Sequence, residues 1–116
     1  MTFDPQKPTA LIVGRFQPFH DGHKALVLEG LRRVGQVCVA VRLTYGLDGN
    51  PFHYRDVRAR IIAMLADHAD RIKVVHLPNI TDVFYGRDVG YNIERIVLDK
   101  EIEAISGTKL REASHG

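Results

Sequence analysis

The sequence has one cysteine, no tryptophan and no long apolar run. The single cysteine, Cys38, excludes an internal disulfide and suits a reducing compartment. Its place within QVCVAV favours a buried structural thiol over a reactive one. No segment approaches the roughly 18 consecutive apolar residues that a membrane-spanning helix needs, and no signal peptide is recognisable. We therefore expect a cytoplasmic protein with no membrane partner.

The net charge is also small. The 16 lysines and arginines and 14 aspartates and glutamates leave a formal charge of +2, and the basic residues are scattered along the chain. This distribution predicts no surface for nucleic acid, so an acidic partner should be small, such as a nucleotide. A length of 116 residues fits one domain, and 45% hydrophobic residues are ordinary for a globular protein.

Short apolar runs alternate with segments of helical periodicity, which predicts an α/β fold. Strands are expected at 10–14, 36–43 and 71–77, helices at 21–35 and 51–69, a weaker fourth strand at 90–98 and the start of a last helix at 106–114. This order implies a Rossmann-like parallel sheet flanked by helices. Ligands of such sheets bind beyond the carboxyl ends of the strands, where two glycine-bearing loops are expected.

The first of these loops, GRFQPFHDGH at 14–23, joins a strand to a helix. A glycine at position 14 permits a sharp turn that exposes peptide N–H groups, and the start of the following helix favours an anion. His20 and His23, three residues apart, can point to the same side and stabilise charge on a phosphate. Two alternatives remain open for the pair: a zinc site, which would need a third ligand, and plain helix capping.

The second loop, AISGTKLRE at 104–112, has a similar character. Ser106, Gly107 and Thr108 provide hydroxyls and a flexible turn where a helix is expected to begin, and Arg111 follows one turn later. An arginine there can fork onto phosphate oxygens, although a simple helix cap would explain the serine and threonine equally well. Two anion-binding helix starts in one small domain indicate a triphosphate held from both sides.

GRFQPFHDGH followed by ISGTKLRE resembles the nucleotidyltransferase superfamily, which has an early His-x-Gly-His signature and a late Ile-Ser-x-Thr-x-x-Arg signature. The resemblance extends from residue 10 to residue 112. It implies that an acceptor oxygen attacks the α-phosphorus of a nucleoside triphosphate and that pyrophosphate leaves, with no covalent enzyme intermediate. His20, His23 and Arg111 match the catalytic positions of the signatures. The implied nucleotide-binding positions are Gly14, Arg15, Phe16, Gly86, Asp88, Ile105, Ser106, Gly107 and Thr108.

An acidic acceptor needs cationic or hydrogen-bonding hosts. The candidates are Gln17, Lys24, Arg42, Arg55 and Arg58. We expect no dedicated metal cage from the protein, because the sequence shows no acidic cluster; Mg²⁺ would be held through the phosphates and water.

The segments TYGLDGNPF and GRDVGYNIERIVL look like those of compact nucleotidyltransferase domains fused to other biosynthetic domains. One such relative is the N-terminal cytidylyltransferase domain of the bifunctional phosphonate enzyme of fosfomycin biosynthesis. This resemblance implies CTP as donor and a small phosphonate or phosphate as acceptor, with residues 1–116 as one domain, the N-terminal part of a longer bifunctional protein. A homodimer is a further expectation.

Two other functions remain in view. GRFQPFH, NPF at 50–52 and SGT also resemble archaeal-type nicotinamide mononucleotide adenylyltransferases, which use ATP. A nucleotide-sensing module without catalysis is the third reading, although the retained histidine pair and Arg111 argue against it.

Overall fold

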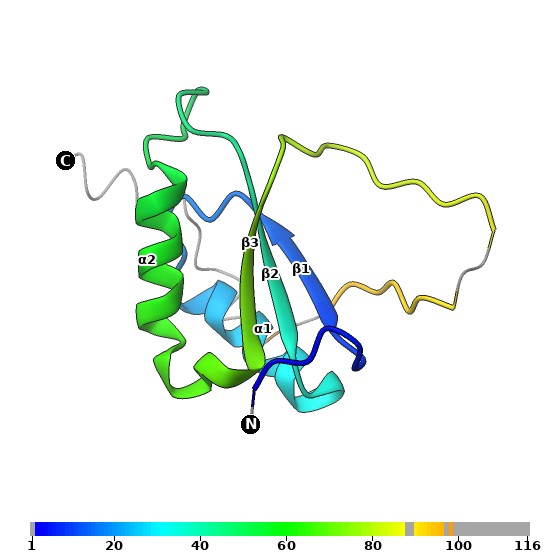
Figure 1. The fold of residues 1–116 in the computed structure, drawn as a ribbon. Coiled ribbons are helices and arrows are strands. Elements are labelled where there is room, and N and C mark those ends of the chain that lie inside the picture. Colours follow the sequence, from blue (N-terminus) through cyan, green and yellow to red (C-terminus); the bar gives the residue numbers. More distant parts are fainter. Residues whose placement is uncertain (1, 88–89, 97, 99–116) are drawn as a thin grey trace.

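Alternating strands and helices build a parallel sheet in the computed structural model, which describes residues 2–87, 90–96 and 98 (Figure 1). The elements, in chain order, are β1 (Ala10–Gly14), α1 (Asp21–Val34), β2 (Val37–Arg42), α2 (Tyr54–Met64), a 3-10 helix (Ala66–Arg71) and β3 (Ile72–Leu77). The predicted α/β, Rossmann-like architecture is therefore confirmed, and the first three predicted strands all form.

The three strands of the described sheet lie in the order β1-β2-β3 and pair in parallel. Gly14 at the end of β1 lies opposite Val41, and Arg42 at the end of β2 lies opposite Leu77. The carboxyl ends of all three strands consequently meet at one edge of the sheet. The loops that follow β1 and β2 gather there, as expected for a ligand site in a parallel α/β sheet.

One face of the sheet carries the core, because both helices pack on it. The strand residues that face the helices are almost fully buried, and they form one cluster with residues from each helix. Its members include Ile12, Val37, Val39, Val41, Val27, Leu31, Val57 and Ile61. The opposite face of β1 is apolar but open, with Leu11 64% and Val13 40% exposed.

Helix α1 ends as predicted at Gly35, whose φ of 105° places it in the left-handed region that favours glycine. The second predicted helix, 51–69, was too long. It begins only at Tyr54, because Pro51 and its neighbours form the end of the preceding loop, and regular α-helix stops at Met64. The chain then continues as a 3-10 helix interrupted at His68, which has non-helical backbone angles.

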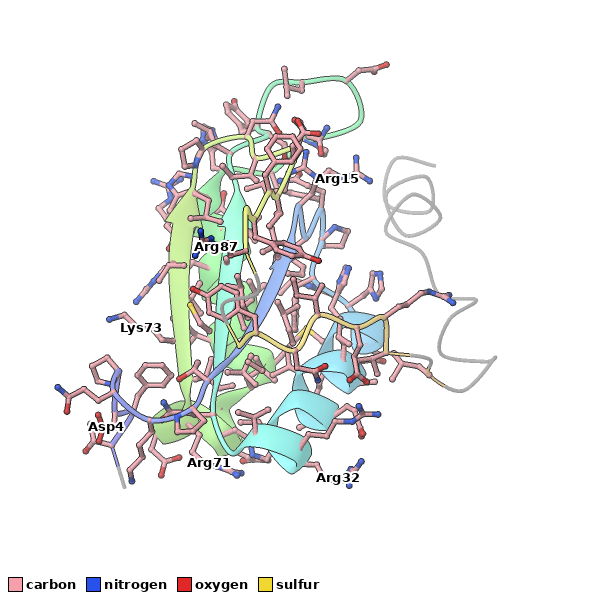
Figure 2. All side chains as sticks on the ribbon, turned by 90° about the vertical axis from the view of Figure 1, so that its right-hand side faces the viewer. Asp4, Arg15, Arg32, Arg71, Lys73 and Arg87 are labelled. Atoms are coloured by element: carbon pink, nitrogen blue, oxygen red, sulfur yellow. The ribbon has the colours of Figure 1, made fainter. Side chains whose placement is uncertain are left out.

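The fourth strand predicted at 90–98 was wrong for the part of it that the structure describes. Residues 90–96 and 98 form no strand, and Tyr91 and Ile93 are 73% and 67% exposed, so no neighbouring strand covers these two side chains. This segment is tied to α1 by an ion pair between Arg33 and Glu94 at 2.5 Å. It crosses the side of the sheet that faces away from α2 (Figures 1 and 2).

The last helix predicted at 106–114 lies outside the described residues. Within the described part of the chain, no helix is both long enough and apolar enough to cross a membrane.

Candidate functional site

The reactive loop, defined as residues 14–20, is shaped by the buried ring of Phe16. Phe16 has a φ of 53°, a left-handed conformation that is uncommon for an aromatic residue, and its side chain is only 2% exposed. A Cβ atom on Gly14 would lie 2.7 Å from Cε1 of that ring. Glycine is therefore needed at position 14 because of the close approach of Phe16, and the sharp turn predicted there occurs two residues later.

The loop ends in a histidine pair that caps α1. The backbone N–H of Gly22 donates to Nδ1 of His20, and the backbone N–H of His20 donates to Nδ1 of His23, each at 3.1 Å. The two imidazoles stack with their ring centres 3.7 Å apart. Because each Nδ1 accepts a hydrogen bond, each neutral ring carries its proton on Nε2. The cap thus fixes both tautomers and gives each ring one N–H donor outside the cap.

Burial keeps the pair neutral. It lowers the pKa of His23 to about 4, and the neighbouring His20 contributes to this shift. Burial also lowers the pKa of His20; Asp21 opposes that shift, whereas Arg60 adds to it. The rings of Phe16 and Phe19 lie 4.9 and 5.4 Å from the ring of His23, so an apolar wall backs the pair. Both histidines are consequently hydrogen-bond donors at neutral pH, not cations.

A second loop, residues 43–53 between β2 and α2, holds the reactive loop in place. The side chain of Gln17 is buried and exchanges two hydrogen bonds with the backbone of Phe52, at 2.9 and 2.8 Å. Arg15 donates to the side chain of Asn50 at 3.4 Å; Arg15 is labelled near the upper end of the sheet in Figure 2. Gln17, predicted to bind the acceptor, therefore has a bracing role between the two loops.

Three contributors to the site were missed by the sequence analysis. Arg60, from the middle of α2, donates through Nε to the carbonyl of Phe19 at 2.5 Å. Asn50 meets Arg15, as described above. Thr44 is 3% exposed, and its hydroxyl has no hydrogen-bond partner within the described chain. The NPF segment offered a signal for Asn50, whereas no pattern connects Arg60 to a residue 41 positions away.

A model of the cytidylyltransferase-like family matches residues 11–84, which is more than half of the chain. The chain belongs to the cytidylyltransferase-like family. No curated protein is significantly similar to it. The matched region of this cytidylyltransferase-like chain contains the reactive loop, the histidine pair and the loop 43–53. Family membership supports nucleotidyl transfer as the general activity, with a nucleoside triphosphate as substrate.

The predicted acceptor-binding cations of this cytidylyltransferase-like protein lie in different parts of the fold. Lys24 lies in the first turn of α1, beside the histidine pair. Arg42 lies one residue past the partner of Gly14, donates to Asn79 at 2.9 Å, and has a buried Nε without a partner in the described chain. Arg55 is exposed and lies 3.6 Å from Asp56. Arg58 lines a separate cavity of about 370 Å³ between α2 and β3.

Of the remaining predicted nucleotide-binding positions, the structure describes only Gly86. Gly86 is exposed, and a Cβ atom there would meet no atom within 4 Å. The other members of that set, together with Arg111, lie outside the described residues: Asp88, Ile105, Ser106, Gly107 and Thr108. No group of three metal-ligating side chains gathers among the residues that the structure describes, and the two histidines direct Nδ1 into the cap. The zinc reading of the pair thus finds no third ligand there.

Proposed function

We propose that this chain transfers CMP from CTP to a small phosphonate or phosphate and releases pyrophosphate. The observation that carries the proposal is the pair of neutral, stacked histidines at the start of α1, each with Nδ1 bound in the cap and Nε2–H available as a donor. Membership of the cytidylyltransferase-like family supports the reaction class. The resemblance of TYGLDGNPF and GRDVGYNIERIVL to fused cytidylyltransferase domains supports CTP and the acceptor class.

In the proposed reaction an oxygen of the acceptor attacks the α-phosphorus of the nucleotide. A new phosphorus–oxygen bond forms, and the bond from the α-phosphorus to the bridging oxygen breaks, so that pyrophosphate leaves with that electron pair. His20 and His23 donate their Nε2–H groups to phosphate oxygens on which negative charge increases. Neither ring needs to gain or lose a proton, which agrees with their lowered pKa values.

The helix α1 reinforces this role. Its first turn carries the positive end of the helix dipole, which favours the charged triphosphate. The rigid ring wall of Phe16 and Phe19 excludes water from one side of the imidazoles, so their hydrogen bonds act in a medium of reduced dielectric constant. We propose that the backbone of Arg15 and Phe16 lies along the triphosphate.

Magnesium is proposed as the metal ion that accompanies the nucleotide. When bound, it would neutralise charge on the phosphates. The described residues offer no gathered set of metal ligands, so the phosphates and water would hold it. The residues of the late motif, Ser106 to Arg111, are proposed to hold the β- and γ-phosphates.

Acceptor binding is proposed at the carboxyl end of β2. Arg42 adjoins the end of β1 through the strand register, and two buried polar atoms there, Nε of Arg42 and the hydroxyl of Thr44, have no partner within the described chain. Buried polar groups are normally hydrogen-bonded, so these two donors at the carboxyl edge of the sheet could bind the oxygens of an anionic acceptor. Lys24 and Arg55 are proposed as further cationic contacts.

The test is pyrophosphate release by the purified chain with Mg²⁺. CTP and ATP are each combined with a panel of small phosphonates, phosphates and nicotinamide mononucleotide. The His20→Ala/His23→Ala double variant serves as the blank. We expect release with CTP and one phosphonate or phosphate. Release only with ATP and nicotinamide mononucleotide would contradict the proposed donor and acceptor, and tight nucleotide binding without release would favour a sensor.

A further inference from the structure

Arg60 holds the peptide group that joins Phe19 to His20. Its Nε donates to the carbonyl oxygen of Phe19 at 2.5 Å. The N–H of the same peptide group belongs to His20, and it donates to Nδ1 of His23 at 3.1 Å. One peptide plane is therefore fixed at both ends, by a guanidinium from α2 at its oxygen and by a site histidine at its nitrogen.

This arrangement connects α2 directly to the direction of the His23 ring. A peptide is planar, so an arginine that fixes the carbonyl also fixes the N–H on the opposite side. A cation at the carbonyl polarises the peptide and strengthens its N–H as a donor, which favours an Nδ1 acceptor on His23. Phe19 is fully buried, so this carbonyl belongs to a rigid part of the loop.

A second contact also connects the reactive loop to the segment that leads into α2. Gln17 is hydrogen-bonded to Phe52, just before α2, and Arg60 contacts Phe19 from within α2. The segment from the end of β2 through α2 thus holds the reactive loop through these two contacts, in addition to the contact between Arg15 and Asn50. Of these two contacts, that of Arg60 is made to the peptide adjoining the histidine pair.

We propose that Arg60 is a positioning residue for the histidine pair and fixes the Nε2–H tautomer of His23 through the Phe19–His20 peptide. This inference deepens the proposed function and rests on it for its catalytic consequence. The charged and titratable groups that act on the pair are the two histidines themselves, Asp21 at the start of α1 and Arg60 on α2. Removal of Arg60 takes away the one cation among them.

The first measurement uses the free protein and needs no nucleotide. Imidazole nitrogen NMR across a pH titration reports the tautomer and the titration midpoint of each histidine in wild type, Arg60→Met and Arg60→Lys. Methionine keeps much of the length of the side chain but has neither donor nor charge, and lysine restores both in part. The control is Arg71→Gln, which removes an equal charge at the opposite edge of the sheet, where Arg71 is labelled in Figure 2.

In wild type we expect His23 in the Nε2–H form. In Arg60→Met we expect a mixture of His23 tautomers and a raised His20 midpoint, with partial recovery of both in Arg60→Lys. In Arg71→Gln we expect wild-type values for His20 and His23, because Arg71 contacts His68 and not this pair. Unchanged tautomers and midpoints in Arg60→Met would overturn the proposal. Should that variant not fold, the wild-type Arg60 Nε–H decides: slow exchange with solvent is expected from its bond to a buried carbonyl, and fast exchange would overturn the proposal.

Kinetics then test the catalytic consequence. In Arg60→Met we expect kcat to fall about tenfold with little change in KM for the nucleotide, because positioning acts on transition-state contacts. An unchanged kcat alongside altered tautomers would overturn that consequence. If the wild-type chain releases no pyrophosphate, the proposed function fails, while the NMR result still decides whether Arg60 positions the pair.

Discussion

At the scale of single residues, Gly14 is constrained by Phe16 and not by its own backbone angles. The ring of Phe16 fills the space in which a side chain at position 14 would lie. The Phe16 backbone, in turn, adopts the left-handed conformation that directs this ring inward. The two residues therefore form one steric unit at the start of the reactive loop.

We predict that Gly14→Ala lowers the free energy of unfolding by about 1–3 kcal/mol, because overpacking displaces a buried ring. Urea denaturation of wild type and variant gives the difference. Gly86→Ala is the matched control, since a side chain there meets no atom within 4 Å and should change stability little. Equal stability of the two variants would show that the Phe16 ring can move at no cost.

The histidine pair is the second feature that operates at this scale. We predict that His23→Ala lowers kcat by roughly 10²–10³-fold while nucleotide binding survives, because its Nε2–H acts mainly on charge that develops in the transition state. Pyrophosphate release and calorimetric titration with nucleotide measure the two effects. His68→Ala, in the 3-10 helix, serves as the control variant. A kcat equal to that of wild type would remove His23 from the mechanism.

At the scale of elements, the cap of α1 makes the fold sensitive to acid. Both Nδ1 atoms accept backbone hydrogen bonds, so protonation of either ring breaks part of the cap. Histidines differ in this respect from serine or aspartate caps, whose acceptors survive at about pH 5. The helix start and the candidate site therefore respond to the same proton.

The sign of the pH dependence follows from the lowered pKa values. His23 titrates at about 4 in the folded chain and near 6.5 when unfolded, so the unfolded state binds more protons between these values. We predict that the melting temperature is constant above about pH 7 and falls as the pH decreases from about 6.5 to about 4. Over that range the free energy of unfolding should decrease by on the order of 2 kcal/mol.

Thermal melts of wild type and His23→Gln across this range provide the measurement. Glutamine does not titrate, so the variant should lose less stability on acidification, although it starts from a lower value. The same slope in both proteins would place the acid sensitivity elsewhere in the chain.

At the scale of the whole molecule, one face of the described sheet carries the packing that holds the site. The helices α1 and α2 share a single core cluster with the strands, which fixes the distance between the reactive loop and α2. The Gln17 and Arg60 contacts depend on that distance. Core packing and site geometry are thus properties of the same interface.

Two adjacent isoleucines of α2 test this packing. Ile61 is fully buried, whereas Ile62 is 41% exposed. We predict that Ile61→Ala costs about 2–5 kcal/mol of stability because it leaves a core cavity, and that Ile62→Ala costs under about 1 kcal/mol. Chemical denaturation measures both. Similar losses in the two variants would contradict the assignment of the core face.

Much of the architecture was predictable because local patterns encode it. Continuous apolar runs predicted β1, β2 and β3, and Gly35 predicted the end of α1, since each signal depends on neighbours within a few residues. The segment 90–98 contains alternating apolar residues as well, but a strand also needs another strand beside it. Its described residues form no strand, so a local pattern was not sufficient.

The candidate site shows the same division. The sequence by itself determined the α/β order, the loop that carries His20 and His23, and the nucleotidyltransferase signature that this loop resembles. Each of these features is encoded by residues that are contiguous in the chain. Only the tertiary structure decided that Gln17 braces a second loop, that the histidines adopt fixed neutral tautomers, and that Arg60 reaches Phe19. Burial and contacts between distant residues set hydrogen-bond partners and pKa values, and these arise only once the helices pack on the sheet.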